Sequence, residues 1–158
     1  RLIRIMQISI RKATIHDMAA VHQLVQELAN YEKAPDEVIT SPNSYQQDYQ
    51  NNAFECIVAV NSSDKILGTC IFYETFSTWK GKMMWLEDFV VNDAQRGQGI
   101  GAKLFEYLIE ESKRRKLVLM KWQIIDWNEP ALNFYSKYNF IKEDNWFNGK
   151  IFFEPKDA

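Results

Sequence analysis

The chain has 158 residues, of which 46% are hydrophobic and 25% are charged, and its formal net charge is −2. This length and apolar share predict one domain over residues 1–158 rather than a disordered chain. The near-neutral charge argues against nucleic acid as a partner, and no apolar run is long enough (about 18 residues) to predict a membrane span.

Hydrophobic periodicity predicts the elements in chain order. Alternation predicts a strand at 8–13, and a capping-box-like pair, Thr14 and Asp17, predicts a helix that ends near Tyr31. The other elements we expect are a short helix from Ser41-Pro42 to about Tyr49, strands at 54–60, 65–75 and 83–91, a long helix from Ile100 to the basic run 113–116, a strand at 117–125, a helix from Pro130 that carries Phe134, Tyr135 and Tyr138, and strands at Phe140-Ile141 and Gly149 to Glu154. This order indicates a mixed α/β fold with one sheet and helices on its faces.

The two cysteines, Cys56 and Cys70, lie in apolar strand-like runs without CxxC or Cys/His spacing. We therefore expect reduced thiols in the core of a cytoplasmic protein. The start of the chain, up to Ala13, lacks the apolar core and the cleavage site of a signal peptide. The two histidines have no partners at metal-ligand spacing, so we expect no metal.

The run 83–91, "MMWLEDFVV", is apolar except for the adjacent carboxylates Glu87 and Asp88. Neighbouring side chains of a strand face opposite sides of the sheet, so only one of the two reaches water easily, and burial of the other costs free energy. An isolated acidic residue in a strand is usually paired with a lysine or caps a gap in the backbone. The burial of one carboxylate of this doublet therefore needs an explanation.

The stretch "RGQGIG" places Gly97, Gly99 and Gly101 just before a helical pattern. Such a loop suits an anion at a helix N-terminus, but several folds use one. A Walker loop needs Gly-Lys-Ser/Thr, which is absent here. A dinucleotide fingerprint is matched by Gly97, Gly99 and Ala102, with Asp126 as the ribose-binding acid, but five residues separate the loop from its strand and little chain follows Asp126.

The stretch "QRGQGIG", with Arg96, Gly99 and Gly101 at the motif positions, resembles the coenzyme A loop of the GNAT acetyltransferases. "WLEDFVV", "WNEPALNFYSKYNF" and "LVQELANYEK" resemble the spermidine/spermine branch of that family, whereas "FSTWKGK" and "DWN" are closer to its thialysine-acetylating group. The resemblance covers about residues 8–153. It implies the GNAT fold, a central, mostly antiparallel sheet with splayed parallel strands four and five and helices on both faces.

The resemblance implies that acetyl-CoA is the co-substrate and that the loop holds its diphosphate. The coenzyme-binding residues implied are Phe89, Val90, Val91, Arg96, Gly97, Gln98, Gly99, Ile100, Gly101, Ala102, Asn128, Pro130 and Tyr135. The segment Phe89–Val91 is expected to contribute backbone N–H groups. On sequence alone, Asn128 is equally well explained as a turn residue before Pro130.

The chemistry implied is attack of an amine on a thioester by direct transfer in a ternary complex. Glu87 would be the base, through a water, and Asp88 would help to hold the ammonium group of the substrate. Tyr135 matches the general acid of the family that protonates the leaving thiolate. Periodicity alone would make Tyr135 one more core aromatic residue.

Substrate binding is implied for both acidic and aromatic side chains, which suit an alkyl chain that ends in a cation. These residues are Tyr31, Glu32, Trp79, Glu87, Asp88, Asp126, Asp144 and Trp146. We expect a small amine as substrate, a homodimer, and neither nucleic acid nor membrane as partner. A protein N-terminal or lysine acetyltransferase and a non-catalytic acyl-CoA sensor remain as alternatives.

Overall fold

The structure is a computed structural model that describes residues 6–153. The chain falls into two compact units, which divide between Gln123 and Ile124. The helices and strands of the described residues are β1 (Ser9–Lys12), α1 (Met18–Tyr31), α2 (Pro42–Gln50), β2 (Glu55–Val60), β3 (Ile66–Ser77), β4 (Gly81–Val91), α3 (Ile100–Arg114), β5 (Met120–Trp122) and α4 (Glu129–Ser136). The sheet and the first three helices belong to the first unit, and α4 belongs to the second.

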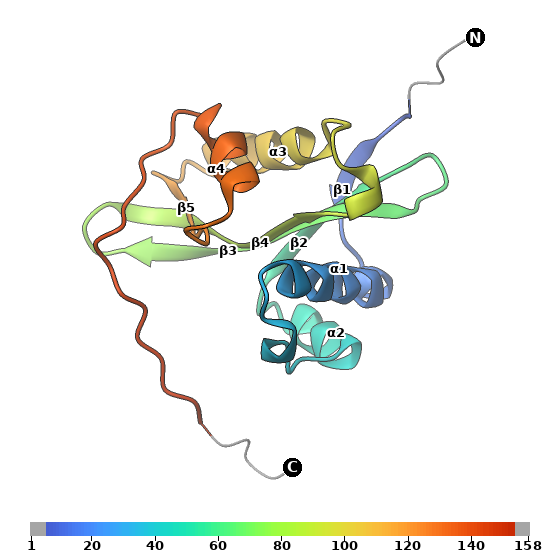
Figure 1. Ribbon diagram of the computed structural model, residues 1–158, viewed down its shortest axis with the longest axis horizontal. Coiled ribbons are helices and arrows are strands. Elements are labelled where there is room, and N and C mark those ends of the chain that lie inside the picture. Colours follow the sequence, from blue (N-terminus) through green and yellow to red (C-terminus); the bar gives the residue numbers. More distant parts are fainter. Residues whose placement is uncertain (1–5, 154–158) are drawn as a thin grey trace. The chain divides into compact units, whose positions relative to one another are not determined.

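The strands of the first unit form one sheet in the order β1-β2-β3-β4-β5 (Figure 1). Each pair is antiparallel except β4 and β5, which are parallel. The parallel pairing covers only Met84–Leu86 against Met120–Trp122, whereas β4 continues to Val91. The two parallel strands therefore part beyond Leu86, and the expected mixed sheet with splayed fourth and fifth strands is confirmed.

Helices cover both faces of this sheet: α1 and α2 lie on one face and α3 on the other (Figure 1). The apolar stripe of α1, with Met18, Val21 and Val25, packs against the inward-facing residues of β2, Cys56 and Val58. The helix α3 buries a similar stripe of its own. None of the helices in the described residues has the length and apolar content that a membrane crossing requires.

The helix starts follow the predicted capping residues. The backbone N–H of Thr14 donates to Asp17 Oδ2 at 2.8 Å, and a 3-10 turn leads into α1. Ser41 Oγ accepts from the backbone N–H of Ser44 at 3.1 Å, with Pro42 in the first turn of α2. These contacts satisfy backbone donors that the helix itself leaves without a partner, so both starts are confirmed.

The elements after α3 differ from the prediction. The strand β5 is shorter than the expected 117–125, because it pairs with β4 over three residues only. The helix α4 ends at Ser136 and leaves out Tyr138. The strands expected at Phe140-Ile141 and from Gly149 are wrong, since residues 140–153 contain no strand; Glu154 lies outside the described residues. Strand propensity is insufficient there, because a strand also needs a neighbouring strand for its backbone groups.

Candidate active site

The adjacent carboxylates Glu87 and Asp88 lie at a bulge in β4. Ile71 of β3 stands opposite Asp88, and the next residue, Phe72, stands opposite Leu86, so Glu87 is an extra residue in β4. In an uninterrupted strand Glu87 and Asp88 would face opposite sides of the sheet. The bulge instead lets both line the same pocket. Glu87 is exposed in this pocket, whereas Asp88 is half-buried.

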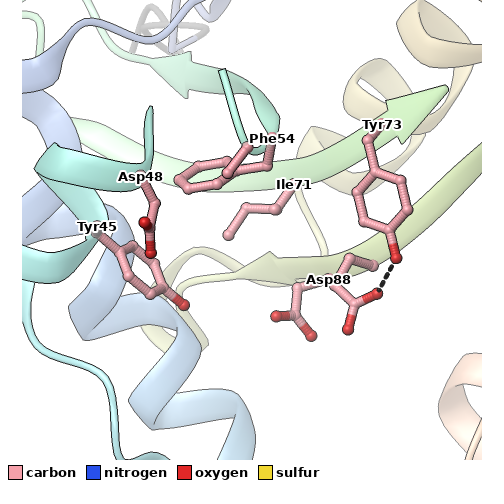
Figure 2. A pocket seen from close by; sticks show the side chains of 8 residues that line it. Tyr45, Asp48, Phe54, Ile71, Tyr73 and Asp88 are labelled. Atoms are coloured by element: carbon pink, nitrogen blue, oxygen red, sulfur yellow. Dashed lines mark hydrogen bonds between the residues drawn. The ribbon is translucent and has the colours of Figure 1, made fainter. Parts of the chain in front are cut away.

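This pocket has a volume of about 390 Å³ and lies between α2 and the strands β3 and β4 (Figure 2). We call it the acidic pocket. It is lined by Tyr45, Asp48, Ala53, Phe54, Ile71, Tyr73, Glu87 and Asp88. It therefore combines three aromatic rings with three carboxylates, and no lysine, arginine or histidine is among these lining residues.

Two donors hold one oxygen of Glu87. Tyr73 Oη donates to Glu87 Oε2 at 3.0 Å, which is the dashed line in Figure 2, and Trp85 Nε1 donates to the same oxygen at 2.7 Å. Burial and the neighbouring charge of Glu87 raise the pKa of Tyr73 to about 12. The phenol therefore keeps its proton at neutral pH and remains a donor that orients the carboxylate.

Asp88 is the carboxylate with the most unusual environment in the pocket. Burial, and then the negative charges of Glu87 and Glu32, raise the pKa of Asp88 to about 6. Burial also raises the pKa of Glu32, which directly follows the last residue of α1. The structure thus brings three predicted residues, Glu32, Glu87 and Asp88, within electrostatic reach of one another. Their excess negative charge suits a cationic ligand.

The glycine loop has the conformation that its residues require. Gly97 and Gly99 have φ of +79° and +77°, in the left-handed region that side chains other than glycine rarely adopt. Lys103 N–H makes the first helical bond of α3, to the carbonyl of Gly99 at 3.1 Å. The N–H groups of residues 100–102 therefore precede the first helical bond, at the positive end of the helix. An anion such as a diphosphate fits this arrangement.

Arg96 and Tyr31 lie together beside this loop. The Arg96 guanidinium carbon is 5.2 Å from the centre of the Tyr31 ring, and Arg96 Nε is 3.1 Å from Asp93 Oδ1. Tyr31 therefore contacts a residue of the predicted coenzyme loop, and it is not among the residues that line the acidic pocket. Its substrate role stays a prediction.

The backbone of Phe89 and Val91 is directed towards the β5 side of β4. Asn92 N–H bonds to the Leu67 carbonyl of β3 at 2.8 Å. Along an antiparallel pair, successive residues direct their backbone N–H and C=O groups to opposite sides of the strand. The backbone groups of Val90 therefore also face β3, and those of Phe89 and Val91 face the opposite side. On that side β5 pairs with β4 only at Met84–Leu86, so β5 does not pair with Phe89 or Val91. The Phe89 side chain stacks on Phe105 at 5.8 Å, so only its backbone is suited to ligand contact.

Trp79 is not brought to the acidic pocket. It is 81% exposed and lies in the turn between β3 and β4, where Ser77 pairs with Gly81. At about 3.3 Å per strand residue, Asp88 is roughly 20 Å further along β4. A substrate role for Trp79 stays a prediction.

The other predicted residues belong to the second unit. Asn128 caps α4, because its side-chain oxygen accepts from Ala131 N–H at 3.2 Å, and Pro130 lies in the first turn. Tyr135 is 7% exposed and packs against Phe134 and Phe140. Asp126, Asp144 and Trp146 are exposed. Capping and packing do not test the coenzyme and acid roles of these residues, so those roles stay predictions.

Sequence reasoning missed six residues of the acidic pocket: Tyr45, Asp48, Ala53, Phe54, Ile71 and Tyr73. Tyr45 and Asp48 are three residues apart and therefore share one face of α2. This spacing was visible in the sequence, but nothing in it showed that this face meets β4. The interstrand register placed Tyr73 opposite Trp85, beside Glu87.

Metal ligands and reactive thiols are not features of the described residues. No group of three or more His, Cys, Asp or Glu side chains suited to a metal occurs within residues 6–153. Burial raises the pKa of Cys56 to about 12 and the pKa of Cys70 well above its usual range. Neither thiol therefore forms a thiolate readily near neutral pH.

Comparison with known proteins gives consistent matches. A family model described as the acetyltransferase (GNAT) family matches residues 19–140. Thialysine N-epsilon-acetyltransferase of Bos taurus is 31% identical over 137 residues, covering 81% of each chain. Spermidine/spermine N(1)-acetyltransferase-like protein 1 of Homo sapiens is 29% identical over 148 residues, which are 87% of this chain and 21% of that protein. The crystal structure of an aminoglycoside acetyltransferase from an uncultured soil metagenomic sample has a TM-score of 0.75 and 19% identity, covering 93% of this chain and 97% of that one.

Proposed function

This chain belongs to the acetyltransferase (GNAT) family, and we propose that it transfers the acetyl group of acetyl-CoA to the primary amine of a small cationic metabolite. The observation that carries the proposal is the acidic pocket, where a bulge gathers Glu87 and Asp88 among aromatic rings without a basic residue. An alkylamine with a pKa near 10.4 is an ammonium ion at neutral pH, so its charge complements this pocket. Relatives named for thialysine and for spermidine/spermine support the same class of substrate.

Glu87 is the proposed base. The ammonium must lose a proton before its nitrogen can attack, and Glu87 is the exposed carboxylate of the pair. Tyr73 and Trp85 both bond to Oε2, so Oε1 is the oxygen that would accept the proton through a water. The half-buried Asp88 would hold the ammonium, and the bound cation would offset its unfavourable burial.

The glycine loop is the proposed site for the coenzyme. Acetyl-CoA supplies the thioester that the amine attacks. The backbone of residues 97–102 would bind its diphosphate at the positive end of α3, and Arg96 would add a charge-assisted contact. The backbone N–H groups of Phe89 and Val91, which turn away from β3, would bond to the acyl and pantetheine part, as would Asn128.

Tyr135 is the proposed acid. The thiol of cysteine has a reference pKa of about 8.5, so a leaving alkyl thiolate is best protonated by a group with a higher pKa, such as a phenol. The match to the family model, residues 19–140, spans both compact units and supports one acetyltransferase domain made of both. The high pKa values of Cys56 and Cys70 support direct transfer to the amine rather than transfer through an acyl-cysteine.

We also propose a cytoplasmic homodimer. The apolar side chains of Ile141, Phe147, Ile151 and Phe153 are between 82% and 102% exposed in the single chain, and a second copy could cover them. Free Cys56 and Cys70 suit a reducing compartment. Sedimentation equilibrium checks the dimer: a monomer across the micromolar range would contradict it.

The test of the proposed function is a panel of acceptors incubated with acetyl-CoA, with release of free thiol as the readout. The panel contains thialysine, spermidine, short diamines and a lysine peptide. We expect turnover of at least one small amine, with a higher kcat/KM than for the peptide. The control is Glu87→Gln, which keeps the size of the side chain and removes the base. Turnover of the peptide alone, or of nothing, would overturn the proposal.

A further inference from the structure

Asp48 is a carboxylate of the acidic pocket for which the proposed reaction has no use. Glu87 and Asp88 come from β4, whereas Asp48 comes from α2 on another wall of the pocket, together with Tyr45 (Figure 2). Its side chain is exposed, so Asp48 is not a residue of the core. Its position relative to β4 makes it a candidate to contact a part of the acceptor other than the reacting amine.

The charge of Asp48 is not balanced within the described residues. None of the ion pairs among residues 6–153 involves it. No lysine, arginine or histidine is among the residues that line the pocket. A cation that enters the pocket therefore meets negative charge from α2 as well as from β4.

The wall that carries Asp48 is aromatic and held in place. The Tyr45 and Phe54 rings pack at 5.7 Å, and the Phe54 and Tyr49 rings at 5.4 Å. The Tyr49 hydroxyl donates to the Ala13 carbonyl at 2.6 Å, which ties this wall to the end of β1. Burial, and then the charge of Asp88, raise the pKa of Tyr45 to about 12, so its ring stays neutral. Such a surface suits the methylene groups of an alkylamine and a cation near their end.

We propose that Asp48 is a specificity-determining residue that binds a second ammonium group of the acceptor. This inference rests on the proposed function and narrows its substrate class. The preferred acceptors are then diamines or longer polyamines without a carboxylate. An amino acid carries an α-carboxylate, which three carboxylates and no cation in the pocket would repel.

Three acceptors of the same chain length separate these contributions: pentane-1,5-diamine, 1-aminopentane and lysine. The diamine and the monoamine differ by the second ammonium, and the diamine and lysine differ by the carboxylate. For the unsubstituted enzyme we expect kcat/KM of the diamine to exceed that of each of the other two by about two- to fivefold, the size expected for one exposed ion pair.

Asp48→Asn tests the residue itself. It keeps the shape of the side chain and removes the charge, so kcat/KM for the diamine should fall to near the value for the monoamine. The kcat/KM for the monoamine should fall much less than that for the diamine, because the monoamine has no second ammonium, and the KM for acetyl-CoA should stay unchanged. Asp36→Asn, at an exposed position that does not line the pocket, is the matched control and should change none of these values.

The outcomes distinguish the two proposals. An unchanged preference for the diamine in Asp48→Asn, or lysine as the better acceptor of the unsubstituted enzyme, would overturn the role of Asp48 and leave the acetyltransferase proposal standing. Loss of turnover with both amines at an unchanged melting temperature would also overturn it, because the residue would then act on the reacting end. If no amine is acetylated by the unsubstituted enzyme, the proposed function fails and this inference with it.

Discussion

The burial of Asp88 makes a quantitative prediction about stability. Its pKa is raised from 3.8 to about 6, mainly by burial and then by Glu87 and Glu32. Between about pH 4 and pH 6 the folded state keeps this proton while the unfolded state has lost it. The free energy of unfolding therefore falls as pH rises through this window, by about 3 kcal/mol for roughly 2 pKa units at 1.36 kcal/mol each.

Asp88→Asn removes the titrating group and should remove this fall. The assay is urea unfolding followed by tryptophan fluorescence, for both proteins, at several values between pH 4 and pH 7.5. The free energy of unfolding of the variant, minus that of the unsubstituted protein, should rise by about 3 kcal/mol between these limits. Groups that titrate equally in both proteins cancel in this difference.

The control is Asp36→Asn, at an exposed position outside the pocket. It replaces an exposed aspartate by asparagine without relieving any burial, so it controls for the chemical change itself. A flat difference for Asp88→Asn would refute the reasoning, because it would mean that the folded state does not disfavour the ionised carboxylate. The proposed contact between Asp88 and an ammonium group would then lose its electrostatic basis.

Three further substitutions test the other parts of the site. Glu87→Gln should depress kcat most at lower pH, where the amine is most protonated, and an unchanged pH–rate profile would contradict the base role. Gly99→Val should abolish detectable coenzyme binding in calorimetry while the circular dichroism spectrum is kept. The reason is that φ of +77° strains a β-branched residue by about 1–3 kcal/mol. Its control is Gly149→Val, where φ is not positive and no atom lies within 4 Å of an added Cβ. Tyr135→Phe should lower kcat by about a hundredfold or more, the low end of the usual 10²–10⁴ contribution of an acid or base, with little change in acetyl-CoA affinity, and full turnover would remove the acid role.

Much of the fold was accessible from the sequence because it depends on local properties of the chain. The period of the apolar residues in α1 and α3, the capping residues Thr14 and Ser41, and the alternation in the segment that forms β1 each act within one turn or one strand. The glycines at 97 and 99 fall into this class as well, since a positive φ is a property of a single residue. The doublet Glu87–Asp88 was also visible as a costly pattern in an apolar strand.

Other features depended on how distant segments meet. The register between β3 and β4 makes Glu87 an extra residue in β4, and only this bulge directs both carboxylates towards the same pocket. The packing of α2 against the sheet then adds Tyr45 and Asp48 to the pocket. Their spacing in the sequence did not indicate which part of the chain they would face. The prediction for segment 140–153 was wrong for a related reason. Its apolar residues have strand propensity, but a strand forms only where a second segment pairs with its backbone. Periodicity reports which side chains share a face, whereas the three-dimensional structure decides what that face meets.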